Sequence, residues 1–280
     1  LSQTLEKIQS NYEFWYLVLK NYNLPWDLPS DRLIEVTRPK KPESLQEVFD
    51  FFDLKLKLKK NNIKLYHSLS PSIINPSKSI KIVNTLHDII PEIFPEEISS
   101  SFAMYLYKLK MRQITKSTHI ITDSNCTKND FIERYNYKSK NISTVYLGSQ
   151  FSKELIESNK KNKKRVWKRK FLLYNGGFND RKNLINIIKS FAKVYKRIPN
   201  VDLLILGNIP LNKLSRLNKL INSFSNLKER IIFKGFIKSS NLAAYYIQSE
   251  LFLFPSSALF LGKKGSSHLK RPELLTSLSP

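Results

Sequence analysis

The segment from Phe171 to Asn183, FLLYNGGFNDRKN, carries residues whose types and spacing suit the binding of an anion. A short apolar run that predicts a buried strand is followed at once by Gly176 and Gly177, which let the backbone turn where a side chain would clash. A ligand can therefore come close to the main chain. The next residues predict the start of a helix, whose free N–H groups and positive dipole end favour phosphate.

A basic pair strengthens this interpretation. We expect Asn179 or Asp180 to cap the helix, which places Arg181 and Lys182 in its first turn. The helix dipole disfavours cations there unless an anion compensates them. The pair therefore points to bound phosphate, and the alternative is a solvated pair in a lysine-rich chain.

Length and composition set the limits of the fold and of its partners. A chain of 280 residues, 41% of them hydrophobic, can furnish the cores of two α/β domains. The formal net charge of +24 favours an anionic partner such as a nucleotide, a nucleic acid or an anionic membrane surface. Because lysine is abundant along the whole chain, we expect no dedicated nucleic-acid role.

Cysteine usage and hydropathy indicate the compartment. Cys126 is the single cysteine, which excludes an internal disulfide framework and suits a reducing compartment. The sequence shows no metal-ligand cluster, no signal peptide and no apolar run near the roughly 20 residues of a membrane-spanning helix. We expect a cytoplasmic protein that needs no metal or other cofactor, with peripheral contact at the inner face of the membrane as a further expectation.

The second half of the chain alternates strands and helices in the way that predicts a parallel sheet. Ligands bind such sheets at the carboxyl ends of the strands. We therefore expect the glycine pair, Gly207 and Gly235 to converge on one edge. The expected elements are strands over Phe171–Tyr174, Val201–Leu206, Arg230–Phe233 and Leu251–Phe254, and helices over Leu184–Lys196, Leu211–Phe224 and Asn241–Gln248.

The first half predicts a similar but less regular alternation. A strand ends at His87 and Asp88 and leads into the proline-punctuated segment IIPEIFPEE, which we interpret as an active loop. Leu1–Lys20 predicts an amphipathic helix, and Lys55–Asn62 predicts a charged turn or loop. The other expected elements are strands over Ile80–Leu86, His119–Thr122 and Ile142–Leu147, and helices over Ser100–Ser117, Thr127–Tyr135 and, in the lysine-rich linker, Ser152–Ser158.

Seven segments occur in an order that resembles the family 4 glycosyltransferases of the GT-B fold. They are HDIIP from His87, ITDSNCTKNDF around Ser124, VYLG, FLLYNGGFNDRKN, VDLLILG, RIIFKGF and ELFLFPSS. The resemblance spans roughly Ile80 to Ser257. It implies two Rossmann-like domains facing across a cleft, a nucleotide-sugar donor held mainly by the second domain, an acceptor held by the first, and transfer with retention of configuration, usually without a bound metal.

The resemblance also assigns roles in the second domain. Arg181 and Lys182 match the basic pair that binds the donor diphosphate, and Gly176-Gly177 match the loop that passes close to it. Their role would be to neutralise charge on the leaving nucleoside diphosphate. Gly207 and Gly235 would permit close approach of the base and ribose.

In the first domain the resemblance implies a different set of contacts. His87 matches a histidine that hydrogen-bonds a sugar hydroxyl or the developing charge; the alternative is a histidine that caps a strand end. We expect Asp88 to orient His87 or the loop rather than to act as a base. Ser124 either contacts the donor or starts the next helix, and Lys128 faces either phosphate or solvent.

The chain departs from the family after Phe254–Ser256. The family has a glutamate there, a glycine-rich turn and a second glutamate eight residues later, which hold the donor sugar and ribose. Here the only acid of Ala258–Pro280 is Glu273. We therefore expect residues 258–280 to be an aberrant, out-of-frame tail and the second domain to be incomplete. We likewise expect the start of the first domain to be missing, because residue 1 is leucine.

Together these observations predict an α/β protein with parallel sheets. The expected parts are an acceptor-side domain over 1–148, a linker over 149–170, a partial nucleotide-sugar-binding domain over 171–257 and the tail. The expected activity is hexosyl transfer from a nucleotide sugar to a glycan or lipid-linked acceptor in polysaccharide or lipopolysaccharide assembly, impaired in this chain. The alternative is a non-catalytic nucleotide-binding remnant of such an enzyme.

Overall fold

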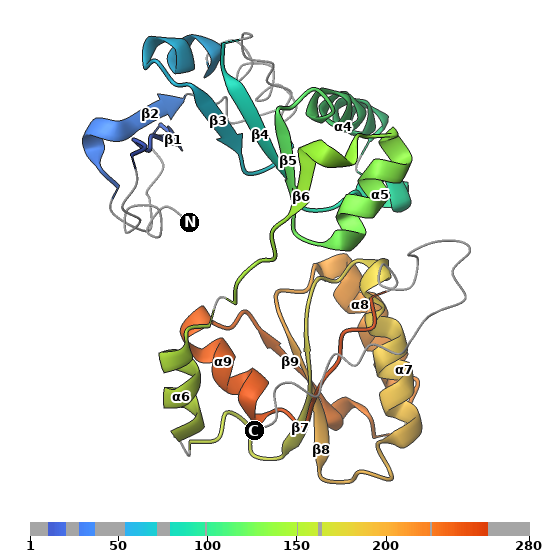
Figure 1. Cartoon of the computed structure of the whole chain (residues 1–280). Coiled ribbons are helices and arrows are strands. Elements are labelled where there is room, and N and C mark those ends of the chain that lie inside the picture. The colour runs from blue at the N-terminus through green and yellow to red at the C-terminus, as the bar shows by residue number, and fades with distance from the viewer. Residues whose placement is uncertain are drawn as a thin grey trace. The chain divides into compact units, whose positions relative to one another are not determined.

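The computed structural model describes residues 11–20, 28–36, 54–71, 79–98, 100–149, 151–161, 164–224 and 226–256. The chain divides into two compact units, Leu1–Leu147 and Gly148–Pro280 (Figure 1). Each unit contains a four-stranded sheet, and the neighbouring strands of both sheets are parallel. The α/β class with parallel sheets that the sequence predicts is therefore confirmed.

The sheet of the first unit has the strand order β3-β4-β5-β6. Its core gathers apolar residues of the central strands and of α4 and α5, including Leu86, Ile120, Met111 and Phe131, all fully buried. The two helices therefore cover the sheet. The elements are β3 (Leu65–Ser68), β4 (Lys81–Leu86), α3 (Ile90–Ile93), η2 (Pro95–Glu97), α4 (Ser101–Ile114), β5 (His119–Thr122), α5 (Asn125–Tyr135), η3 (Ser139–Asn141) and β6 (Ile142–Thr144).

The beginning of the first unit differs from the expectation. The helix predicted over Leu1–Lys20 is wrong where the structure describes it, because β1 (Tyr16–Leu19) pairs in parallel with β2 (Leu33–Val36), which follows η1 (Ser30–Arg32). The run YLVL is aromatic and branched, as strands prefer. Trp15 and Leu17 pack against the core of this pair, whereas Tyr12 is exposed. Residues 1–10 lie outside the described residues.

The charged loop predicted over Lys55–Asn62 is also wrong. Residues 54–60 are helical, and Leu54 and Leu58 are buried against Ile34 and Val36 of β2. The two leucines are four residues apart and therefore share one helical face. The lysines between them occupy the other faces, and their number conceals this apolar pair.

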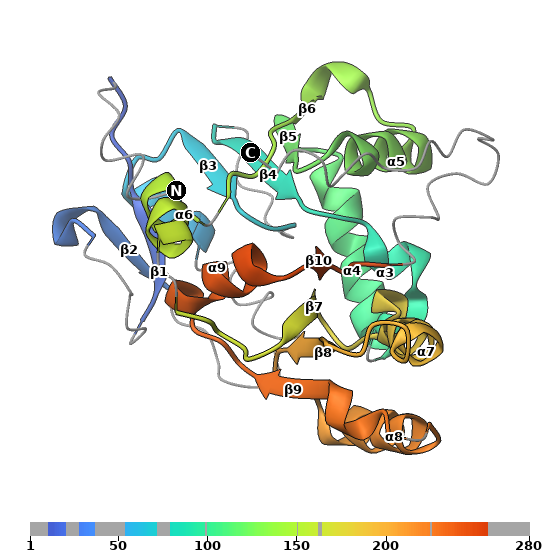
Figure 2. The ribbon, with the colours of Figure 1, turned by 90° about the horizontal axis from the view of Figure 1, so that it is seen from below.

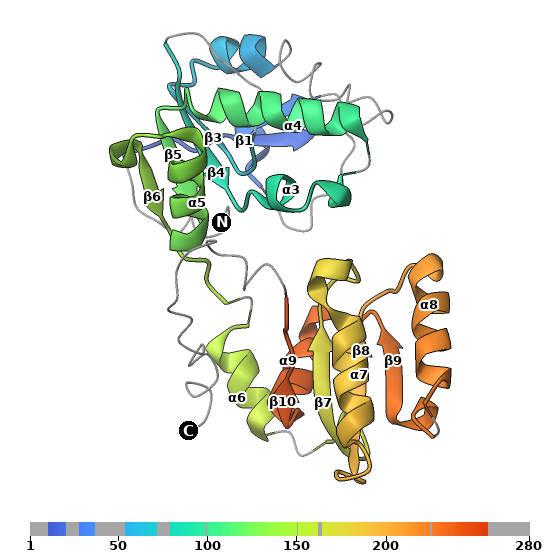
Figure 3. The same ribbon diagram turned by 90° about the vertical axis from the view of Figure 1, so that its right-hand side faces the viewer.

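The sheet of the second unit has the order β10-β7-β8-β9, as Figure 2 shows. The segment Lys153–Lys161 of the expected linker forms helix α6, which packs against α9. Both lie on the opposite side of this sheet from α7 and α8 (Figure 3). The elements are α6, β7 (Lys170–Asn175), η4 (Asp180–Lys182), α7 (Leu184–Val194), β8 (Val201–Leu206), α8 (Leu211–Asn222), η5 (Lys228–Arg230), β9 (Ile231–Gly235), α9 (Ser239–Gln248) and β10 (Leu251–Phe252).

Strand β8 is buried on both of its faces. Leu203 and Ile205 pack into the core formed with α7 and α8, and Leu204 and Leu206 pack into the core on the α9 side. All four are buried because side chains alternate between the two faces of a strand. The continuous apolar run VDLLIL thus supplies two cores at once.

One of the sequence expectations concerns a segment outside the described residues. Residues 257–280, which contain the expected aberrant tail, lie outside the described residues. Within the described part of the chain, no helix is long and apolar enough to cross a membrane.

A buried carboxylate joins the amino end of β8 to the segments around it. Asp202 is 2% exposed. Its Oδ2 accepts a 2.7 Å hydrogen bond from Trp167 Nε1, and its Oδ1 accepts one of 2.8 Å from Arg230 Nε. Arg230 also donates to the carbonyl oxygens of Ile198 and Val201. One side chain therefore ties the segment before β7 and the start of β9 to β8.

Replacing Asp202 by asparagine should destabilise the second unit. The change leaves the Arg230 guanidinium, whose side chain is 12% exposed, without its counter-charge. Breaking a buried ion pair in this way costs about 3 to 5 kcal/mol of unfolding free energy. Urea denaturation followed by circular dichroism measures the loss. Glu250→Gln is the control, because its ion pair with Lys170 is exposed on both sides. An equal effect of the two substitutions would contradict the role given to Asp202.

Candidate functional site

The predicted phosphate-binding residues of the second unit lie at the carboxyl edge of its sheet. Gly176 and Gly177 follow β7, Gly207 follows β8, and Gly235 ends β9. The Gly207 N–H donates a 2.7 Å hydrogen bond to the Gly235 carbonyl, so the structure brings these two glycines together. Both have positive φ, +111° and +67°. The backbone there adopts conformations that glycine permits and other residues rarely take.

A buried tyrosine fixes the glycine pair. The Tyr174 hydroxyl donates a 2.6 Å hydrogen bond to the Gly177 carbonyl. Burial raises the pKa of Tyr174 to about 12, so the hydroxyl stays neutral and keeps its proton at physiological pH. A Cβ atom at Gly176 would lie 3.1 Å from that hydroxyl oxygen, whereas one at Gly177 would meet nothing closer than Lys182 Cγ at 3.9 Å. The Gly177 backbone is therefore open to a ligand.

The basic pair lies just before the helix rather than in its first turn. Arg181 and Lys182 belong to the short 3-10 turn η4, and α7 begins at Leu184 with Asn183 as its N-cap residue. The expectation that Asn179 or Asp180 caps this helix is therefore wrong. Asn183 has a left-handed backbone (φ 60°), which separates η4 from α7.

Lys182 and an aromatic ring gather beside the glycine pair. The Lys182 ammonium lies 4.7 Å from the centroid of the Phe254 ring. The same ring would be 3.7 Å from a Cβ atom at Gly176. A cation held over an aromatic face keeps its charge close to the glycine backbone. This group of a cation, a ring and open main chain can hold a phosphate and flank it with an apolar surface.

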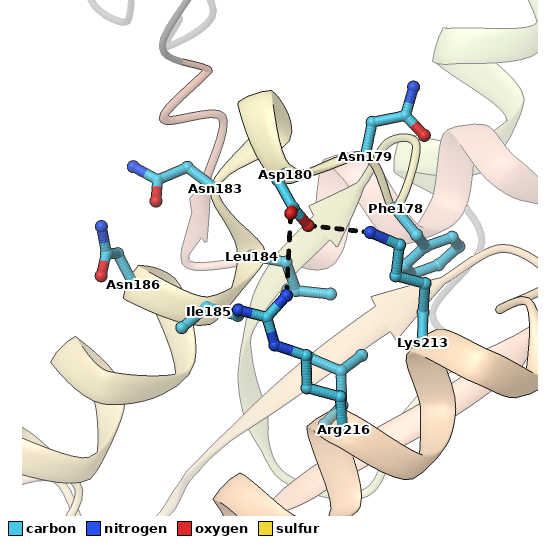
Figure 4. A pocket seen from close by; sticks show the side chains of 10 residues that line it. Phe178, Asn179, Asp180, Asn183, Leu184, Ile185, Asn186, Lys213 and Arg216 are labelled. Atoms are coloured by element: carbon cyan, nitrogen blue, oxygen red, sulfur yellow. Dashed lines mark hydrogen bonds and ion pairs between the residues drawn. The ribbon is translucent and has the colours of Figure 1, made fainter. Parts of the chain in front are cut away.

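The Asp180 carboxylate points to Lys213 and Arg216 of helix α8, as Figure 4 shows. Its Oδ1 accepts a 2.9 Å hydrogen bond from Lys213 Nζ, and Arg216 lies 3.6 Å from Oδ2. The bond from Lys213 holds the pKa of Asp180 below its ordinary value. These residues line a cavity of about 210 Å³ between the starts of α7 and α8. Lys213 and Arg216 were not predicted from the sequence. A basic residue in the first turn of a helix, such as Lys213, is disfavoured by the helix dipole and could have indicated a nearby anionic group.

An exposed aromatic residue completes this edge of the sheet. Phe236 follows Gly235 directly and is 71% exposed. Asn208 lies nearby, since its side-chain oxygen would be 3.9 Å from a Cβ atom at Gly235. Neither residue was singled out from the sequence. The sequence could have indicated Phe236 as a site residue, because it directly follows the glycine that ends a strand. At that position its ring lies outside the core of the sheet.

In the first unit, His87 is held by two acceptors. Its Nδ1 lies 2.6 Å from Asp123 Oδ2, and its Nε2 lies 2.8 Å from the carbonyl oxygen of Leu69. Only the imidazolium can donate to both. The hydrogen bond to Asp123 is the largest of the effects that raise the pKa of His87 above its ordinary value. His87 is therefore a half-exposed side chain at the carboxyl end of β4, and both acceptors favour its protonated form.

Asp123 was missed as the partner of His87, although the sheet register would have found it. Leu86 of β4 pairs with Thr122 of β5, so the next residues of the two parallel strands emerge side by side. The Asp88 side chain instead accepts a 3.0 Å hydrogen bond from the N–H of Ile90 in its own loop. Asp88 thus shapes the loop that leads into α3, and Asp123 orients His87.

Ser124 and Lys128 lie at the start of α5. The Ser124 hydroxyl accepts a 3.1 Å hydrogen bond from the N–H of Thr127, as an N-cap residue does. Thr127 in turn donates to the carbonyl oxygen of His87 at 3.1 Å, which connects this helix start to the histidine loop. Lys128 is half-buried in the following turn. In the described part of the chain, no group of three or more potential metal ligands is found.

Comparison with known proteins agrees with the geometry of the second unit. Residues 156–265 match the family model of the group 1 glycosyl transferases. The match falls within the second unit and covers less than half of the chain. The Bacillus subtilis protein named uncharacterized glycosyltransferase YqgM is 32% identical over 102 residues, which cover 36% of this chain and 28% of that protein. The serotype-specific mannosyltransferase WbdA of Escherichia coli is 27% identical over 205 residues, 68% of this chain and 24% of WbdA.

Solved structures share the fold of this chain. Sucrose-phosphate synthase from Thermosynechococcus elongatus superposes with a TM-score of 0.60 at 16% identity, covering 84% of this chain and 63% of that protein. HepE from Anabaena, solved in complex with UDP, gives a TM-score of 0.54 at 16% identity, with 80% and 61% covered. The chain thus spans about a quarter of the length of the curated relatives and about three fifths of these structures.

The two touching glycines should differ in their tolerance of a side chain. Gly207→Ala should cost about 1 to 3 kcal/mol of unfolding free energy, because its φ of +111° is strained for alanine and the new Cβ would stand 3.2 Å from the Phe178 ring. Gly235→Ala should cost less, since its φ of +67° is left-handed helical and its nearest contact is at 3.9 Å. Urea denaturation of both variants compares them. A larger loss for Gly235→Ala would contradict the geometry.

Asp123→Asn should lower the pKa of His87 toward its ordinary value, because the hydrogen bond that chiefly raises it loses its charge. A raised folded-state pKa means that His87 stabilises the fold below its unfolded pKa of 6.5, and that this contribution disappears as the pH rises through the folded pKa. An NMR titration of the histidine ring protons measures the shift. His67, whose pKa is lowered by burial, is the internal control. An unchanged His87 titration in the variant would refute the pairing.

Proposed function

We propose that this chain is a retaining glycosyltransferase of family 4, which moves a hexose from a nucleotide-sugar donor to a glycan or lipid-linked acceptor in polysaccharide or lipopolysaccharide assembly. The observation that carries the proposal is the gathering of Lys182, the Phe254 ring and the open Gly177 backbone at the carboxyl edge of the second sheet. The match of residues 156–265 to the group 1 glycosyl transferase model and the UDP complex of HepE support it.

The donor diphosphate would lie against the glycine pair. The Tyr174 hydroxyl holds the Gly177 carbonyl, so the loop keeps its shape before the ligand arrives. Lys182 and Arg181 would neutralise the charge that develops on the leaving nucleoside diphosphate. Cations fixed in advance lower the barrier more than mobile ones, because they need no reorganisation during the reaction. In this proposal the basic pair supplies the positive charge that a divalent metal supplies in other phosphate sites.

The nucleoside would occupy the neighbouring strand ends. Gly207 and Gly235 have no side chains to block the approach of a base and ribose. The exposed Phe236 ring offers a flat apolar surface next to them, on which a base can stack. The Asp180 bonds to Lys213 and Arg216 would anchor η4 from its outer side, so that Arg181 and Lys182 stay at the glycine pair.

His87 would act on the sugar in the first unit. A protonated imidazole can donate to a sugar hydroxyl or to developing negative charge. Its Nε2 donates to the Leu69 carbonyl in this structure, so a sugar contact through Nε2 requires that bond to be shared or exchanged. Asp123 keeps the ring charged and oriented. Ser124 is assigned to helix capping, and Lys128 to a secondary contact with phosphate.

We further propose a cytoplasmic location with peripheral contact at the inner face of the membrane, where lipid-linked acceptors are presented. Helix α4 exposes Phe102 and Tyr105, and the exposed Lys108 and Arg112 follow at helical spacing. Aromatic and basic side chains on one helix suit the surface of an anionic bilayer.

The second candidate function is that of a nucleotide-binding remnant without turnover. It is favoured by the sequence after Ser256, where Glu273 is the only acid. The two candidates share the phosphate site and differ in sugar transfer. Release of nucleoside diphosphate from a panel of UDP- and GDP-sugars in the presence of bacterial glycolipid acceptors would favour the enzyme, and binding without release would favour the remnant.

Lys182→Ala should weaken the binding of UDP or GDP by about tenfold or more, since a charged hydrogen bond to phosphate contributes about 1.5 to 3 kcal/mol. Isothermal titration calorimetry measures the affinity. The matched control is Lys189→Ala, which removes the same charge from an exposed position of α7. Equal affinity of the two variants for both nucleotides would overturn the assignment of the phosphate site.

A further inference from the structure

A second concave site lies at the amino edge of the sheet of the second unit, opposite to the candidate donor site. It is a cavity of about 300 Å³ between the end of α6, the segment that leads into β7 and the end of α9. The two helices lie side by side on this side of the sheet (Figure 1). Lys170 begins β7 and Glu250 directly precedes β10, so the cavity opens where the strands start.

The cavity is lined by more positive than negative charge. Lys160, Arg165, Arg169 and Lys170 line it, and Glu250 is the single carboxylate among its lining residues. The sequence from Asn159 to Lys170 contains no acidic residue at all. Cations this close repel one another within the screening length of about 8 Å at physiological salt. An anion in the cavity would relieve that repulsion.

The neighbouring carboxylates offset only part of this charge. Glu157 of α6 lies 3.8 Å from Lys160, and both side chains are exposed. Glu250 lies 3.3 Å from Lys170, and the pair is exposed on both sides. Asp202 is 3.6 Å from Arg169 but is already bonded more closely by Arg230 at 2.8 Å. Arg165 donates to the carbonyl oxygen of Lys168 at 3.5 Å, which is a weak neutral acceptor.

The dipole of helix α6 accounts for only one of the cations that line the cavity. Lys160 lies in the last turn of α6, where the helix dipole favours a cation. Arg165, Arg169 and Lys170 lie beyond the end of that helix, so the dipole does not account for them. Their presence around one cavity needs another cause.

Hydrogen bonds hold the backbone on either side of Arg165. Gln248, at the end of α9, accepts a 2.9 Å hydrogen bond from the N–H of Val166 and donates one of 3.0 Å to the carbonyl oxygen of Lys164. Trp167, which supplies an apolar wall, is held by its bond to Asp202. The cations are thus presented from an ordered frame, which lowers the entropic cost of binding.

We propose that this cavity binds a phosphate group, carried either by a soluble phosphate ester or by a lipid headgroup. Phosphate matches the site because arginine guanidinium groups bind its oxygens in pairs and lysine ammonium groups add charge. The site is independent of the proposed glycosyltransferase function, and it lies at the opposite edge of the sheet from Lys182. Of its four cations, Arg169 pairs with Asp202 and Lys170 with Glu250, so Lys160 and Arg165 are the two that pair with neither of these carboxylates.

The test uses the full chain with Lys182→Ala, which weakens the contribution of the proposed donor site. Inorganic pyrophosphate is titrated calorimetrically, and vesicles with 30% phosphatidylglycerol are tested by co-sedimentation. Adding Lys160→Ala and Arg165→Ala should weaken binding of at least one probe by about tenfold or more. The control adds Lys189→Ala and Lys193→Ala instead, which remove two exposed charges from α7. Thermal unfolding of both variants verifies that the fold is retained.

The two arms distinguish the source of the phosphate. Pyrophosphate binding that depends on Lys160 and Arg165 supports a soluble ester, and vesicle binding alone that depends on them supports a lipid headgroup. Equal weakening by the patch variant and the α7 control, or no binding of either probe to the Lys182→Ala protein, would overturn the proposal.

Discussion

The second unit depends on one constraint, which is that a parallel sheet must be covered on both faces. Strand β8, VDLLIL, has apolar side chains on both faces. Leu203 and Ile205 pack toward α7 and α8, and Leu204 and Leu206 pack toward the α9 side. Helices on both faces leave only the two edges of the sheet open to ligands. At the carboxyl edge stand the glycine loops with Lys182, and at the amino edge stands the basic cavity. The buried carboxylate of Asp202 secures the strand that both edges share.

Electrostatics at the strand ends follows from the same parallel arrangement. Neighbouring parallel strands end at the same edge of the sheet. The residues that directly follow two such strands therefore lie close together, although they are far apart in the sequence. His87 and Asp123 meet in this way after β4 and β5, and Gly207 meets Gly235 after β8 and β9. In the first pair Asp123 orients the His87 ring, and in the second pair the two glycines leave space beside the strand ends.

The regular elements could be predicted because their periodicity is strong and local. The strand Val201–Leu206 and the strand His119–Thr122 have the bounds expected from the sequence, and α7 begins at the expected Leu184. The failures have physical causes. Lysines conceal the Leu54 and Leu58 pair in a helical segment, and the strand β1 is stabilised by its partner β2 rather than by its own pattern. The Asp123 and Lys213 contacts depend on sheet register and helix packing, which the sequence specifies only once the topology is known.

We propose above all that a nucleoside diphosphate binds at the carboxyl edge of the second sheet. A crystal structure of the chain soaked with UDP is the decisive experiment. We expect the diphosphate against the Gly176-Gly177 backbone and the Lys182 ammonium, with the base beside Phe236. Well-ordered UDP at any other place in the second unit, with the glycine loop unoccupied, would contradict it.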